Sequence, residues 1–168
     1  MATYYRYKRP ITNSGAITTE SMTLEDWLAD EDTKYMPCLA IKDKNGDYRD
    51  IIEFVADIGI VHSDIDGDDA GRNKTNSARM KRDYIGQKHT LEVKMINHIP
   101  QTVAYTVLRL VLTTKSKMSF FAYYQSPCVG EKRESEFYVS TYNFGAQRYD
   151  RQSKKCFYDG LNFNMIEM

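Results

Sequence analysis

Acidic side chains at alternating positions form the group with the clearest potential for metal chemistry. Asp64, Asp66 and Asp68 alternate along the chain, and Asp69 follows directly. Calcium loops place carboxylate ligands in this way, but they also need a glycine at the sixth position and a bidentate glutamate at the twelfth. This chain has Asp69 and Thr75 there, so we interpret the run as an acidic turn rather than a calcium site.

The histidines and cysteines lack the close spacing that is usual for metal sites. They are His62, His89, His98, Cys38, Cys128 and Cys156. Because zinc needs sulfur or nitrogen ligands in close sets, we expect no zinc site, and we expect His89 to be an exposed partner of a carboxylate. The odd number of cysteines predicts small buried or half-buried thiols in a reducing compartment.

No catalytic motif accompanies these residues. The chain has no GxSxG turn, no glycine loop that would cradle a phosphate and no paired cysteine and histidine. A triad assembled only in space would leave no such pattern. We therefore predict that the protein is not an enzyme, with no catalytic residue, metal or cofactor.

Charge separates along the middle of the chain. Residues 43–69 hold nine acids against two bases, and residues 71–95 hold seven lysines or arginines against two acids. Two interpretations stay open: solvated loops whose charges compensate within the chain, or head-to-tail assembly in which one subunit's acidic side meets the next one's basic side. The residues expected at such a subunit interface are Asp64, Asp66, Asp68, Asp69, Arg72, Arg79, Lys81 and Arg82.

The basic run at 72–82 could also contact phosphates, with tyrosines and phenylalanines stacking on bases. However, 23 basic side chains balance 23 acidic ones, so no overall field steers the protein toward nucleic acid or an anionic membrane. The aromatic residues mostly alternate along expected strands, where packing explains them. Nucleic-acid binding is therefore the weaker interpretation of the basic run.

The length of 168 residues suits one domain with its own core. No apolar run approaches the roughly 18 residues that span a bilayer, and the opening MATYYRYKRP lacks the apolar segment of a signal peptide. We expect a soluble protein made in a cytoplasm. It should comprise an N-terminal arm or extension (1–35) and a single β-rich domain (36–168).

The elements that must position these residues can be read from capping and periodicity. Thr23 can cap a short helix that carries Trp27, which we expect to anchor the extension by packing, with a subunit contact as the alternative. Strands are expected at 37–43 and 48–55, joined by a tight turn at Asn45-Gly46, with a further short strand at 56–62. Residues 64–83 have no apolar periodicity and predict a long loop that delivers the chain into a strand starting at Lys88.

The second half predicts one helix and further strands. Apolar residues recur at helical spacing from Val103 to Val111, so we expect a helix at about 100–113 with Pro100 in its first turn. Strands are expected at 117–125, 136–141 and 157–167, and a polar loop at 142–155. The predicted fold class is α+β: a mainly antiparallel sheet or split barrel with one packed helix, plus an N-terminal extension with a short helix.

Several segments together carry a resemblance. They are IVHSDIDGDDAGRN, MKRDYIGQKHTLEVKM, FFAYYQSPCVGEKRESEFYVS and LNFNMIE. Over about two-thirds of the chain they resemble a group of short structural proteins encoded in the tail modules of bacteriophages and prophages. The order of elements is also similar to the N-terminal domain of distal tail proteins and to lambda-type minor tail proteins.

This resemblance implies a distal tail or baseplate ring subunit. Such domains assemble as hexameric rings, so the expected partners are copies of this chain and other phage tail proteins, with no membrane. The implied location is the tail of the virion, after assembly in the host cytoplasm. The alternative is a small monomeric phage protein that binds nucleic acid or inhibits a host factor.

Overall fold

The computed structural model describes residues 1–9, 17–66, 71–72, 80–81, 84–114 and 116–168, with the backbone alone at 66, 71–72, 80–81 and 84–85. Most of the described residues lie in strands. None of the described helices is long and apolar enough to cross a membrane.

Nine strands form one open sheet in the order β2-β1-β4-β3-β10-β11-β14-β8-β5. Their bounds are β1 Thr3–Lys8, β2 Thr18–Thr23, β3 Leu39–Lys42, β4 Tyr48–Asp50, β5 Val55–Asp66, β8 Tyr84–Met95, β10 Phe120–Gln125, β11 Lys132–Asn143 and β14 Asn162–Glu167. All pairs are antiparallel except β1 with β4. This confirms the predicted α+β class with a mainly antiparallel sheet, and strands β2 and β5 are left as its two edges.

The remaining elements are short. They are the three-stranded sheet β12 (Ala146–Asp150), β13 (Lys155–Asp159) and β9 (Ile99–Pro100), the pair β6 (Gly71–Arg72) and β7 (Met80–Lys81), and the helices α1 (Leu24–Ala29), η1 (Ile52–Phe54) and α2 (Gln101–Val111).

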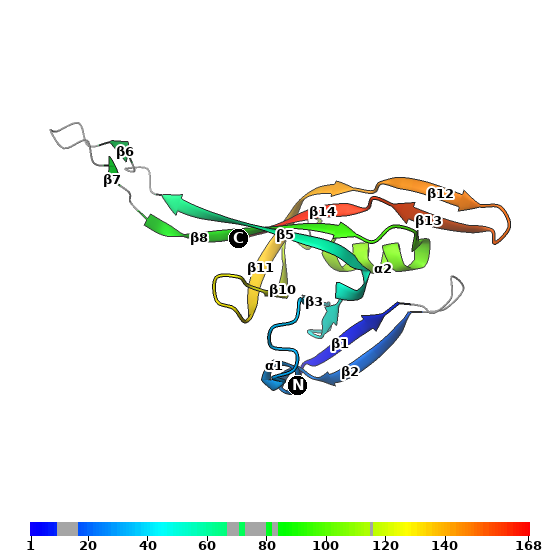
Figure 1. Ribbon diagram of the computed structural model, residues 1–168, viewed down its shortest axis with the longest axis horizontal. Helices are drawn as coiled ribbons and strands as arrows, with labels where there is room; N and C mark the ends of the chain where they lie inside the picture. The colour runs from blue at the N-terminus through cyan, green and yellow to red at the C-terminus, as the bar shows by residue number, and fades with distance from the viewer. Residues whose placement is uncertain (10–16, 67–70, 73–79, 82–83, 115) are drawn as a thin grey trace.

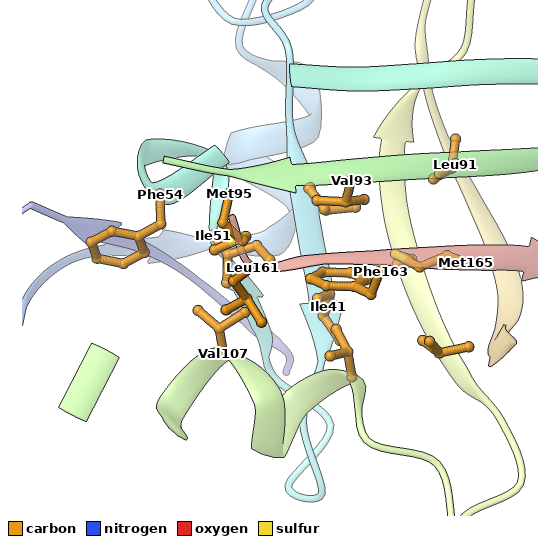
Figure 2. Close-up of a cluster of buried hydrophobic side chains, with 14 of the residues drawn as sticks. Ile41, Ile51, Phe54, Leu91, Val93, Met95, Val107, Leu161, Phe163 and Met165 are labelled. Carbon is orange, nitrogen blue, oxygen red and sulfur yellow. The ribbon is translucent and has the colours of Figure 1, made fainter. Parts of the chain in front are cut away.

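Helix α2 packs on one face of the large sheet, as its apolar spacing predicted. Its buried face is made of Val103, Ala104, Val107 and Val111. Figure 2 shows Val107 pointing from the helix toward side chains of the sheet and its flanking segments, including Leu161. Burying a side chain of this size stabilises the fold by about 1.5–3 kcal/mol, which outweighs the modest helix propensity of valine.

The N-terminal residues belong to the same sheet, although the expected division at residue 35 treated them as an arm. Strand β1 pairs with β4, and Tyr4 and Trp27 are buried with their rings stacked at 4.2 Å. Together with Cys38, Ala40 and Tyr48 they form a second core, the N-terminal cluster, on the face of the sheet opposite α2. The reason is alternation in β3: Leu39 and Ile41 face the α2 core while Ala40 faces the N-terminal cluster. Trp27 is therefore a packing anchor, as predicted.

Several segments differ from the sequence-based expectation. The single strand predicted at 157–167 is divided into β13, which ends at Asp159, and β14, which begins at Asn162 in a different sheet, because the chain bends at Gly160 with φ +74°. Residues 142–155, predicted as a polar loop, contain the end of β11 and all of β12. The sequence did not indicate β12 because every residue of this strand is exposed, so it has no alternation of polar and apolar residues. The predicted strand 48–55 is shorter, since η1 interrupts it after Asp50.

The predicted loop 64–83 was only partly correct. Residues 64–66 are the end of β5, β6 and β7 lie within the segment, and the strand expected from Lys88 already begins at Tyr84, because backbone pairing continues where apolar periodicity has ended. The segment connects a long hairpin. Strands β5 and β8 pair from Val55↔Met95 to Asp66↔Tyr84, and Figure 1 shows them leaving the body toward β6 and β7. Strand β14 pairs with β8 only between Thr90 and Lys94. Residues 62–66 and 84–89 therefore form a two-stranded ribbon, about 20 Å long at the usual rise per residue.

Candidate functional site

The structure describes the position of four of the eight predicted interface residues. Asp64 and Asp66 lie near the end of β5, Arg72 lies in β6 and Lys81 in β7. The residues Asp68, Asp69, Arg79 and Arg82 lie outside the described residues. The four interface residues within the described part of the chain thus lie in strands β5, β6 and β7 rather than on separate sides of the domain.

The root of the hairpin carries a polar cluster that the sequence did not predict. His62 of β5 and His89 of β8 are directly opposite each other across the two strands, and His62 Nδ1 lies 3.0 Å from His89 Nε2. Cys128, in the turn between β10 and β11, places its Sγ 3.5 Å from His89 Nε2 and 3.8 Å from His62 Nδ1. Three segments distant in sequence therefore bring two imidazoles and a thiol together.

Each imidazole of this cluster also contacts a carboxylate. His62 Nε2 lies 3.0 Å from Asp64 Oδ1, and His89 Nδ1 lies 3.6 Å from Glu167 Oε2. Glu167 is itself held by Arg133 and by the Ser135 hydroxyl, each at 2.6 Å, and it accepts the backbone N–H of His89 at 2.8 Å. Asp64 is thus within hydrogen-bond distance of the His62 ring, and Glu167 holds the backbone of His89 and lies near its ring.

His89 is buried and neutral. Its side chain is 0% exposed, and burial lowers its pKa below the ordinary value. The Tyr124 hydroxyl lies 2.5 Å from His89 Nδ1, and burial raises the pKa of Tyr124, so that this hydroxyl keeps its proton. The prediction of an exposed His89 was wrong, because His89 continues the inward row of Leu91 and Val93, but a carboxylate partner is present.

The cysteines are placed differently from one another. Cys38 is buried and Cys156 is half-buried, whereas Cys128 is exposed. The turn that carries Cys128 is closed by backbone hydrogen bonds from Gly130 N–H to the Ser126 oxygen at 2.8 Å and from Ser126 N–H to the Glu131 oxygen at 3.0 Å. This turn holds the thiol over the two histidines.

A basic groove lies elsewhere, beside α2 and β10. It has a volume of about 680 Å³, and the charged residues of its lining are Lys42, Lys44, Arg109 and Lys117 with one acid, Asp43. Lys42 Nζ also stands 5.4 Å from the centre of the Phe121 ring. Such a lining suits an anionic ligand or an acidic partner segment.

The cluster of His62, His89 and Cys128 could not be found from spacing. The sequence separates these residues by 27 and 39 positions, and only the register of β5 against β8 and the fold of the β10–β11 turn bring them together. The one available signal was the alternation of His89 with Leu91 and Val93, which places the imidazole on the inward face.

In comparisons with known proteins, no protein-family model matches the chain, and no curated protein matches it significantly.

Proposed function

We propose that this chain is a structural protein of a phage tail, a distal tail or baseplate ring subunit that acts by self-assembly. The observation that carries the proposal is the ribbon formed by residues 62–66 and 84–89, which extends beyond the last neighbouring strand, β14. The resemblance of the segments from Ile58 onward to tail-module proteins supports the biological setting.

A projecting ribbon of this kind is poorly explained as an element of a solitary domain. Isolated two-stranded hairpins are marginally stable in water, and the unpaired edges of strands are templates for pairing with another chain. Strand β5 is also an edge of the large sheet along its whole length. A neighbouring subunit that packs on this edge would satisfy the backbone groups of β5 and stabilise the ribbon.

The charges of the hairpin supply orientation for such an assembly. Its β5 limb ends in Asp64 and Asp66, and Lys81 lies on the returning limb. Opposite charges on two limbs of one hairpin favour a head-to-tail contact, in which the acidic limb of one subunit meets the basic limb of the next. In a closed ring every subunit makes both contacts.

The test is charge reversal at the basic limb. We expect the triple variant Arg79→Glu, Lys81→Glu, Arg82→Glu to shift the chain from a discrete oligomer toward monomer, measured by light scattering over a range of concentrations. Circular dichroism checks that the variant is folded. The control triple variant Arg148→Glu, Arg151→Glu, Lys154→Glu makes the same change of charge at exposed positions near the β12–β13 turn and should leave assembly unchanged.

Two outcomes would contradict the proposal. An oligomer of the same size in the Arg79, Lys81 and Arg82 variant would remove the role of the hairpin charges. A chain that stays monomeric at every concentration would count against a self-assembling ring.

The basic groove favours a second candidate function. A monomeric protein could hold an acidic segment of a host factor, or nucleic acid, against Lys42, Lys44, Arg109 and Lys117. Binding of an oligonucleotide by this route should weaken steeply as salt rises, because phosphate contacts release counterions. Fluorescence anisotropy with a labelled oligonucleotide distinguishes the candidates, since a ring subunit should self-associate without nucleic acid.

A further inference from the structure

The separations within the cluster of His62, His89 and Cys128 match those of a tetrahedral metal site. Zinc binds histidine nitrogen at about 2.0–2.1 Å and cysteine sulfur at about 2.3 Å, which places two nitrogens about 3.3 Å apart and a nitrogen and a sulfur about 3.6 Å apart in a tetrahedron. The observed separations are 3.0 Å between the nitrogens and 3.5 and 3.8 Å from sulfur to nitrogen. A metal ion can therefore sit between the three atoms with shifts of a few tenths of an ångström.

The surroundings of the two imidazoles suit the same role. A histidine that binds zinc through one nitrogen usually donates its other N–H to a carboxylate or a similar acceptor, which fixes the ring. Here His62 Nε2 faces Asp64 at 3.0 Å, and His89 Nδ1 faces the Tyr124 oxygen at 2.5 Å and Glu167 at 3.6 Å. On each ring, the nitrogen that does not face Cys128 therefore has an acceptor nearby, while His62 Nδ1 and His89 Nε2 lie closest to Cys128.

A chain of hydrogen bonds can hold the same residues in place without metal. With the proton of each histidine on Nε2, the Tyr124 hydroxyl donates to His89 Nδ1, His89 Nε2–H donates to His62 Nδ1, and His62 Nε2–H donates to Asp64. Metal binding requires only that the proton of His89 move to Nδ1, where the Tyr124 oxygen can accept a hydrogen bond from it, and that the Cys128 thiol release its proton to water. The ligands are therefore preorganised.

We propose that His62 Nδ1, His89 Nε2 and Cys128 Sγ bind a zinc ion, with the fourth position open to water. The exposure of His62 and Cys128 leaves the ion accessible from solvent. The site joins β5, β8 and the β10–β11 turn at the point where the ribbon leaves the body, so zinc acts as a clamp on the root of the hairpin. This inference does not depend on assembly of the chain.

Cobalt substitution tests the ligand set directly. The full chain is purified, stripped with a chelator and titrated with Co²⁺, which is the spectroscopic substitute for Zn²⁺. We expect one ion per chain, a thiolate-to-cobalt charge-transfer band in the near ultraviolet and the strong visible bands of tetrahedral cobalt. Zinc should then displace cobalt and abolish these bands, and it should raise the Tm of the chain.

Variants at the exposed ligands distinguish the site from adventitious binding. His62→Asn and Cys128→Ser should each weaken zinc affinity more than about 100-fold, since even loss of an orienting group costs about 10–100-fold. Cys128→Ser should also remove the charge-transfer band, whereas the control Cys156→Ser, a half-buried thiol in β13, should change neither property. His89 is not substituted in this test. Because its side chain is buried, its replacement could lower zinc affinity by unfolding the chain as well as by removing a ligand.

Asp64 supplies an independent test of orientation. We expect Asp64→Asn to weaken zinc affinity by about 10-fold while the charge-transfer band persists, because the thiolate still binds the ion. A cobalt complex without the charge-transfer band would overturn the proposal. Zinc affinity that His62→Asn and Cys128→Ser both leave unchanged would overturn it as well.

Discussion

Replacing Tyr4 with phenylalanine removes a single hydroxyl from the N-terminal cluster and tests whether residues 1–35 belong to the cooperative fold. The Tyr4 hydroxyl donates to Asp50 Oδ2 at 2.5 Å, and Asp50 Oδ1 accepts the backbone N–H groups of Leu39 at 3.1 Å and Ile52 at 3.0 Å. Asp50 is 2% exposed. The phenylalanine ring keeps the stack on Trp27, so the variant isolates the hydrogen bond.

The expected loss follows from the nature of that bond. Hydrogen bonds to charged groups contribute about 1.5–3 kcal/mol, and a buried carboxylate that loses one donor has no water to replace it. The two backbone donors remain, so we expect Tyr4→Phe to lower the free energy of unfolding by about 2 kcal/mol at a pH where Asp50 is ionised.

The loss should depend on pH. Burial raises the pKa of Asp50 above its ordinary value, even though its hydrogen bonds favour the charged form. A folded-state pKa above the unfolded one means that ionised Asp50 costs stability at any pH above the folded pKa, and that this cost is relieved as pH falls through the folded pKa. Tyr4→Phe removes a donor to the ionised form, so its effect should shrink to about 1 kcal/mol, the value for a neutral hydrogen bond, once Asp50 is protonated.

Urea denaturation followed by fluorescence of Trp27, the only tryptophan, measures both quantities. The difference between variant and parent cancels the titration of other carboxyl groups. Tyr5→Phe is the matched control, because the Tyr5 ring keeps its contact with the Arg49 guanidinium at 3.9 Å, and it should change stability by less than about 0.5 kcal/mol. A Tyr4→Phe loss no larger than the control, or one that grows as pH falls, would refute the reasoning.

Two further predictions concern turns. Gly145→Ala should destabilise the β12–β13 hairpin by several kcal/mol or displace it, because φ of Gly145 is +66° and the new Cβ would lie 2.0 Å from the Asp159 oxygen. Gly46→Ala should cost only about 1–2 kcal/mol, because φ of Gly46 is +89° but the new Cβ would meet open space. Urea denaturation of both variants measures the difference. Asp43 is partly buried, which by itself would raise its pKa, but hydrogen bonds from Arg49 and two backbone N–H groups lower it overall. Asp43→Asn should therefore cost up to about 1 kcal/mol at pH 7, and this difference should disappear as pH falls through the lowered pKa of Asp43; a pH-independent difference would contradict it.

Local sequence was sufficient wherever a segment's own chemistry decided its structure. Thr23 caps α1 by accepting the Asp26 N–H at 3.1 Å, Gly46 takes the positive φ of the predicted turn, and the apolar spacing around Val107 gives the buried face of α2. Capping, turn geometry and periodic burial act between residues close in sequence, so their signals are visible in the chain itself.

Local sequence patterns could not predict which strands pair when the strands lie far apart in the sequence. Strand β12 has no buried residue, so only backbone pairing with β13 makes it a strand. Strand β1 joins the sheet through a parallel contact with β4, 44 residues along the chain, and no local signal distinguishes it from a free arm.

By itself, the sequence determined the α+β class, the position of α2, the Asn45-Gly46 turn and the separation of charge around the hairpin. Only the tertiary structure decided that the predicted long loop connects a projecting hairpin and that His62, His89 and Cys128 meet at its root. The physical reason is register: which residue of β5 faces His89 depends on pairing along twelve-residue strands, a property of the whole hairpin. The position of Cys128 depends in turn on how β10 and β11 meet β8 through the rest of the sheet.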